Sequence, residues 1–199
     1  MGALQYIKNF IQDKDVAAIA PSSKFLVERV CRWIDFSEPC RIVEYGPGDG
    51  VFSEYMLEHM GPESSLLLIE SNENFVRQLR ERTRRDDRAT VVCDRAENVR
   101  EIMEAIQMPE ADYVVSGIPF SFLDDDTRKD LLVRTRSVLG DDGKFLVYQN
   151  YNHMEEPLRR HFPSVTKEYE LFNLPPMFAY EALKNGPDNG QHLRANSAS

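Results

Sequence analysis

The chain has 199 residues, of which 42% are hydrophobic and 29% are charged, and this composition is typical of one soluble domain with a substantial core. Its formal net charge of −9 argues against a nucleic-acid partner, because neutralising phosphates requires a basic surface. The three cysteines form no C-x-x-C pair and indicate reduced thiols in a cytosolic protein. None of the histidines has the spacing of a metal ligand, and no apolar run reaches the ~20 residues of a membrane span.

The first predicted element is a short amphipathic helix at residues 3–12. Its apolar stripe consists of Leu4, Ile7, Phe10 and Ile11. Such a helix can pack on the domain, lie in a membrane interface or close over a binding site. The charges of residues 3–35 nearly cancel, so they give little support to the membrane alternative.

A second helix is predicted after Pro21. Ser22 or Ser23 is a favourable N-cap, and the apolar pattern extends to about Phe36. Capping alone would explain both serines.

A glycine-rich turn follows the first apolar strand, Cys40 to Val43, and precedes a helical pattern from Val51 to Met60. The turn reads Glu44-Tyr45-Gly46-Pro47-Gly48-Asp49-Gly50. Glycines accept positive φ and allow a ligand close to the backbone, and the following helix presents free N–H groups. A nucleotide-like ligand suits such a turn, although an ordinary strand–helix connection would use the same residues.

The next strand, Leu66 to Glu70, ends in a carboxylate about 20 residues after the last glycine. Rossmann-like folds place an acid here on ribose hydroxyls, and the alternative is a surface glutamate at a strand end. Ser71 and Asn72 are candidate caps of the next helix.

Alternating strands and helices fill the rest of the chain and predict a parallel sheet. The predicted strands are Ala89–Cys93, Tyr113–Ser116 and Lys144–Gln149, the predicted helices are Glu97–Ile106, 124–136 and Pro157–Phe162, and Gly140–Gly143 is a predicted turn. Two alternating segments, Val165–Phe172 and Met177–Leu183, predict an antiparallel hairpin.

The pattern E-x-G-x-G-x-G after a first strand resembles motif I of class I S-adenosylmethionine-dependent methyltransferases. Three further elements resemble bacterial phospholipid (phosphatidylethanolamine) N-methyltransferases: A-I-A-P-S-S at residues 18–23, S-G-I-P-F at 116–120 and N-L-P-P at 173–176. The second element is more distantly similar to the N-I-P-Y element of rRNA adenine dimethyltransferases. Gly117 stands where those proteins carry Asn, which together with the acidic charge weighs against rRNA methylation.

The resemblance implies an α/β fold with a Rossmann-like seven-stranded sheet, helices on both faces and a C-terminal antiparallel hairpin. Residues 1–36 are predicted as an N-terminal helical segment or lid, residues 37–184 as the methyltransferase domain and residues 185–199 as a flexible polar tail. A monomer is expected.

The resemblance also implies S-adenosylmethionine as cofactor and S-adenosylhomocysteine as product. Asp94 would accept from the adenine amine, although it could instead cap the following helix. The residues predicted to contact the cofactor are Ser22, Ser23, Glu44, Tyr45, Gly46, Gly48, Gly50, Glu70, Ser71, Asp94, Arg95, Ala96, Ser116 and Gly117.

The expected reaction is N-methylation of a phospholipid or other amino-lipid by a cytoplasmic enzyme, with residues 3–12 as the candidate contact to the inner face of the membrane. An aromatic wall beside the transferred methyl would stabilise a methylated ammonium, although core packing explains each ring equally well. The predicted catalytic residues are Phe120, Tyr148, Tyr151, His153 and Tyr180, with Tyr151 or His153 as proton relay. The alternatives are a soluble small-molecule or peptide methyltransferase, an rRNA adenine methyltransferase and a non-catalytic cofactor-binding module.

Overall fold

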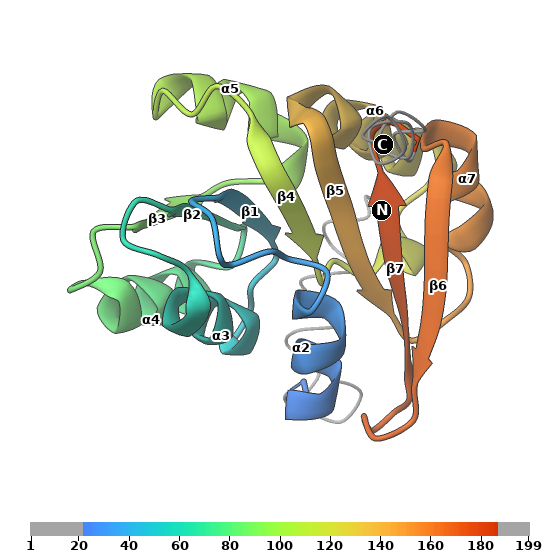
Figure 1. Ribbon diagram of the computed structural model, residues 1–199, viewed down its shortest axis with the longest axis horizontal. Coiled ribbons are helices and arrows are strands. Elements are labelled where there is room, and N and C mark those ends of the chain that lie inside the picture. The colour runs from blue at the N-terminus through green and yellow to red at the C-terminus, as the bar shows by residue number, and fades with distance from the viewer. Residues whose placement is uncertain (1–21, 187–199) are drawn as a thin grey trace, which may run out of the picture.

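A computed structural model describes residues 22–186 and shows a seven-stranded sheet with helices on both faces (Figure 1). The predicted helix at residues 3–12 and most of the predicted tail lie outside this range. The strand order is β3-β2-β1-β4-β5-β7-β6. Strands β1 to β5 pair in parallel, whereas β7 is antiparallel to both β5 and β6, which confirms the predicted fold.

The strands are β1 Arg41–Tyr45, β2 Ser65–Glu70, β3 Ala89–Cys93, β4 Ala111–Ser116, β5 Leu139–Gln149, β6 Ser164–Glu170 and β7 Met177–Leu183. The helices are α2 Lys24–Cys31, α3 Val51–His59, α4 Glu73–Thr83, α5 Val99–Ala105, α6 Asp125–Val138 and α7 Glu155–His161, with 3-10 turns η1 Ala96–Asn98 and η2 Phe120–Phe122. None of these described helices is long and apolar enough to cross a membrane.

Two apolar layers hold the sheet between the helices. One layer joins α5, α6 and α7 to strand residues such as Val43 and Phe145. The other joins α2, α3 and α4 to residues such as Ile42 and Leu146. Because successive side chains of a strand point to opposite faces, each buried strand supplies both layers.

Two predicted caps, Ser23 and Asn72, have that role, and Asp124 at the start of the predicted 124–136 helix is a third cap that was not predicted. Ser23 accepts from the Leu26 amide at the start of α2 (3.3 Å), Asn72 from amides of α4, and Asp124 from an amide of α6. Asp94 is not an N-cap residue, because the N-caps of η1 and α5 are Arg95 and Asn98.

Several predicted boundaries are wrong for local reasons. Helix α2 ends at Cys31 rather than near Phe36, because i→i−3 hydrogen bonds from Trp33 and Ile34 tighten its last turn. Strand β6 ends at Glu170 rather than Phe172, because the Glu170 side chain accepts from the Phe172 amide (2.7 Å).

The turn predicted at Gly140–Gly143 lies inside β5 as an irregularity of its pairing with β4. The segment folds tightly on itself, since a Cβ on Gly143 would lie 2.8 Å from the Gly140 carbonyl oxygen. The glycines therefore form a bulge in a strand that continues. The predicted helix Glu97–Ile106 is divided between η1 and α5, and α6 extends to Val138.

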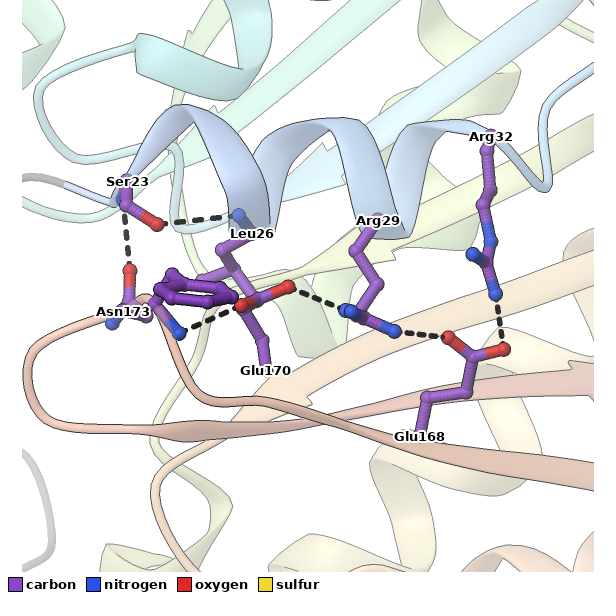
Figure 2. A network of polar contacts seen from close by, with 8 residues as sticks. Ser23, Leu26, Arg29, Arg32, Glu168, Glu170 and Asn173 are labelled. Carbon is purple, nitrogen blue, oxygen red and sulfur yellow. Dashed lines mark hydrogen bonds and ion pairs between the residues drawn. The ribbon is translucent and has the colours of Figure 1, made fainter.

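A polar network joins α2 to the β6–β7 hairpin (Figure 2). We call it the α2–hairpin clamp, and its members are Ser23, Arg29, Arg32, Glu168, Glu170 and Asn173. Arg29 donates to Glu170 (2.6 Å) and Glu168 (2.7 Å), and Arg32 also pairs with Glu168. The Ser23 amide donates to Asn173 Oδ1 (2.8 Å).

The Glu170 carboxylate of this clamp is nearly buried. Burial opposes its ionisation, but hydrogen bonds from Arg29 and the Phe172 amide outweigh that effect and lower the pKa of Glu170. The clamp therefore carries a charged, paired carboxylate at neutral pH and fixes the start of α2 against the hairpin.

Candidate functional site

The glycine turn lies between β1 and α3, at the edge of the sheet where the parallel strands end. Gly46, Gly48 and Gly50 have φ of +62°, +56° and +84°, a region that side chains disfavour. A Cβ on Gly48 would meet no atom within 4 Å, so this part of the turn borders open space. The backbone geometry explains the glycine spacing and leaves room for a ligand.

Glu70 ends β2, and its carboxylate connects two loops. Oε2 accepts from the Gly48 amide (3.1 Å), and Oε1 accepts from the Asn72 amide (2.8 Å). Burial raises the pKa of Glu70, while backbone donors that include Ser71 oppose the rise. Each oxygen of a carboxylate has two lone pairs, so both retain acceptor capacity for a diol.

Glu44, on β1, is buried against α3. Its Oε2 accepts from Ser53 Oγ (2.6 Å). Its Oε1 is also buried and has no hydrogen-bond partner within residues 22–186, and it is the one buried side-chain oxygen or nitrogen of that range in this state. Burial raises the pKa of Glu44 from 4.5 to about 8, Ser53 opposes the rise, and the charges of Glu70 and Asp49 add to it. The carboxyl is mostly protonated at neutral pH, and a cation beside it would favour ionisation.

Asp94 follows β3 beside Glu70, whose carbonyl oxygen accepts from the Asp94 amide (3.1 Å). Asp94 Oδ1 accepts from the Arg95 amide (2.7 Å) and the Asn98 side chain (2.8 Å). The Arg95 side chain is exposed and that of Ala96 is buried. The structure thus brings Asp94, Glu70 and the glycine turn to one edge.

Tyr148 of β5 lies against Gly117, the residue that directly follows the neighbouring strand β4. The Tyr148 ring stacks on Phe52 of α3, with ring centroids 4.4 Å apart and 8° between the planes. Burial raises the pKa of Tyr148 well above its usual range, and a hydrogen bond with the Ser22 side chain opposes the rise. Tyr148 is therefore a neutral phenol that connects Ser22 to the Gly117 backbone.

Gly117→Ala should destabilise the protein by about 1–3 kcal/mol, the usual cost of overpacking. A Cβ at this position would overlap the Tyr148 hydroxyl and lie 2.7 Å from its Cζ. The measurement is denaturant unfolding, with Gly61→Ala as matched control because a Cβ there meets nothing within 4 Å. Equal unfolding midpoints for both variants would contradict the steric explanation, which also accounts for the absence of Asn at position 117.

Three of the predicted site side chains face the core on the α5–α6–α7 side of the sheet: Tyr45, Phe120 and Tyr180. The Tyr45 hydroxyl lies 3.3 Å from Thr135 Oγ1 of α6, and the Tyr180 hydroxyl donates to Asn152 Oδ1 (2.8 Å). All three rings are fully buried, so none of these side chains lines the ligand site. Tyr45 can contribute to that site through its backbone. Packing against the helices, rather than a ligand, accounts for these side chains.

The remaining predicted residues are distributed between the strand ends and the surface. Ser116 is buried, and its Oγ accepts from the Ile118 amide (3.3 Å). Tyr151 and His153 follow β5 with ring centroids 5.6 Å apart, and Tyr151 is 62% exposed. The Ser71 side chain is exposed.

Three supporting residues were not predicted. Phe52 of α3 stacks on Tyr148, and Ser53 of the same helix donates to Glu44. Gln149 binds the 118–120 loop. Gln149 donates to the Ile118 carbonyl (2.6 Å) and accepts from the Phe120 amide (3.1 Å). A polar residue that ends an apolar strand was the available signal for Gln149.

Comparisons with known proteins identify similar chains. A family described as methyltransferase domain matches residues 42–143. The ornithine lipid N-methyltransferase of Singulisphaera acidiphila is 30% identical over 180 residues, which cover 87% of this chain and 91% of that protein.

Two solved structures share the fold. Burkholderia thailandensis 1,6-didemethyltoxoflavin-N1-methyltransferase, solved with S-adenosylhomocysteine bound, has a TM-score of 0.64 and 16% identity over 92% of this chain and 87% of its own. Geobacter metallireducens precorrin-6y C5,15-methyltransferase has a TM-score of 0.64 and 12% identity over 83% of this chain and 90% of its own.

Proposed function

This chain belongs to the family of S-adenosylmethionine-dependent methyltransferases, and on that premise we propose that it methylates the amine of an amino-lipid. The observation that carries the proposal is the 30% identity, across most of both chains, to an ornithine lipid N-methyltransferase. The proposal places the enzyme in the cytoplasm, with residues 3–12 as a contact to the inner face of the membrane.

The residues at the carboxyl edge fit the cofactor. The buried Oε1 of Glu44, which has no hydrogen-bond partner among the described residues, suits a cationic group, and the open space at Gly48 suits a backbone-bound ligand. Glu70 would hold the ribose hydroxyls, and Asp94 the adenine amine, with backbone N–H groups of residues 95 and 96 at the ring edge. The bound cofactor supplies an electrophilic methyl group, and the protein supplies position and electrostatics.

Orientation of the acceptor amine is the main task of the protein in this reaction. Holding two reactants in line can contribute about 7–11 kcal/mol to lowering a barrier. Tyr148, stacked on Phe52, is the aromatic face that we assign to the ammonium side, where each ring contributes ~0.5–2 kcal/mol. Phe120 and Tyr180 are left out of this assignment because their rings are fully buried in the core.

An alkylammonium must lose a proton before its nitrogen can attack. Tyr148 remains neutral, since burial holds its pKa well above the usual range, so it can orient the amine by hydrogen bonding but is a poor base. Tyr151 and His153 lie at the exposed end of β5, where a proton can pass to solvent. We assign the relay to this pair.

Methyl transfer from labelled S-adenosylmethionine tests the proposal. Three acceptors would be compared: vesicles containing an ornithine-type amino-lipid, vesicles containing phosphatidylethanolamine, and a water-soluble ornithine amide without vesicles. We expect label in the amino-lipid and little in the soluble amide. Preferential methylation of the soluble amide would instead assign a soluble acceptor, and methylation of neither lipid nor amide would reject amine methylation.

A further inference from the structure

We propose that the loop between β6 and β7 inserts into the surface of an anionic lipid bilayer and presents the carboxyl edge of the sheet to it. The inserting surface, called the hairpin tip, consists of Leu171, Phe172 and Leu174 together with Phe25 of α2. The inference rests on the proposed amino-lipid substrate and assigns a second membrane contact, separate from residues 3–12.

The hairpin tip is an exposed apolar cluster. Leu171, Phe172 and Leu174 are 66%, 74% and 78% exposed, and Phe25 is 46% exposed. The rings of Phe25 and Phe172 contact each other at a centroid distance of 5.4 Å. Scattered single apolar residues are normal on a surface, but three long side chains within four residues of one loop indicate a binding surface.

The tip is held in place by the clamp beneath it. The Glu170 side chain accepts from the Phe172 amide (2.7 Å), and Asn173 donates to the Pro175 carbonyl (2.8 Å) and accepts from the Ser23 amide (2.8 Å). Because these contacts already order the loop, little conformational entropy is lost when it inserts.

The tip lies beside the candidate site. Strand β6 is antiparallel to β7, which is antiparallel to β5, so the β6–β7 loop lies at the edge where β5 ends (Figure 1). Asn173 binds Ser23, and the neighbouring Ser22 binds Tyr148. A bilayer that receives the tip therefore faces the residues assigned to the acceptor amine.

Charge favours a bilayer over a second copy of the chain. Residues 22–32 and 164–177 contain four basic and three acidic residues, a net charge of +1, whereas the whole chain carries −9. The Lys24 ammonium lies 5.5 Å from the Phe25 ring centroid, so an apolar and a cationic group stand side by side, as at membrane interfaces. Two chains of charge −9 repel each other.

The test is co-sedimentation of the full chain with vesicles of phosphatidylcholine and phosphatidylglycerol. The test variant is Leu171→Ser/Phe172→Ser/Leu174→Ser, and the control is Val133→Ser, which removes an exposed apolar side chain from α6. We expect at least about tenfold weaker partition of the triple variant and unchanged partition of the control. Thermal unfolding and cofactor titration should match wild type for both, because these side chains are exposed.

Three outcomes would overturn the inference. Equal partition of the triple variant and wild type would show that the tip does not insert. A dimer in solution that the triple variant dissociates would assign the tip to a second copy. If the triple variant and a chain lacking residues 1–12 lost the same amount of thermal stability, the tip would instead be the packing surface of residues 1–12. Failure of the proposed function has a different signature, namely tip-dependent vesicle binding without methylation of any amino-lipid.

Discussion

Replacing Glu44 by Gln should stabilise the cofactor-free protein by a few kcal/mol at pH 8 and leave its stability unchanged near pH 4.5. The pKa of Glu44 rises from 4.5 to about 8 on folding, so between these values the folded state holds a proton that the unfolded state has lost. The contribution of Glu44 to wild-type stability therefore falls as pH increases through this window, by up to about 1.4 kcal/mol per pH unit. An amide is uncharged at every pH and does not contribute this loss.

The measurement is denaturant unfolding of both proteins from pH 4.5 to 8, with the exposed Glu58→Gln as control for the change of charge. The Gln side chain retains an acceptor for Ser53, so the comparison isolates ionisation. A constant difference across the pH range would show that Glu44 ionises normally in the folded protein.

The same residue links cofactor binding to proton release. A cation beside Glu44 favours the carboxylate, so titration of S-adenosylmethionine at pH 7 should release a proton into the buffer. Calorimetry in buffers of different ionisation enthalpy measures that proton, and Glu44→Gln should bind more weakly and release none. Equal proton release by both proteins would place the cation elsewhere.

Glu70→Ala should weaken S-adenosylmethionine binding by about 1–3 kcal/mol, roughly 5- to 150-fold. The substitution removes the acceptor assigned to the ribose and also leaves the Gly48 and Asn72 amides without their carboxylate partner. The glycine turn and the start of α4 would lose their shared support, so a stability loss should accompany the loss of affinity.

The matched control is Glu73→Ala, which removes an exposed carboxylate from the first turn of the same helix. Calorimetric titration of S-adenosylmethionine and S-adenosylhomocysteine into each variant separates the two contributions. If Glu70→Ala and Glu73→Ala bind both ligands as the wild type does, Glu70 is a structural residue of the turn.

The features that were predictable from sequence are those that depend on neighbouring residues. Positive φ at Gly46, Gly48 and Gly50, the caps at Ser23 and Asn72, and the strand that ends in Glu70 all follow from local backbone requirements. The parallel order of the sheet follows from the alternation of strands and helices.

The features that sequence did not predict depend on which face of a strand a side chain occupies and on distant partners. Tyr148 and Tyr180 are both strand tyrosines, yet one stacks on α3 and the other lies in the opposite apolar layer. The alternation of a strand defines two faces, but only the packed helices decide which of them borders the ligand edge. The need for glycine at position 117 arises from Tyr148, a residue 31 positions away, and no local pattern reveals it.

The α2–hairpin clamp also imposes an order on the assembly of the protein. Its partners are far apart in the chain, with Arg29 and Glu170 separated by 141 residues and Ser23 and Asn173 by 150. Contacts between such distant residues form slowly, because closing a long loop costs entropy before any contact forms. During synthesis, the polar contacts of α2 with the hairpin must wait until residues 168–173 have left the ribosome, although its apolar face can already pack against α3. The part of the ligand edge that α2 and the hairpin form is thus completed later than the glycine turn and Glu70, which lie early in the chain.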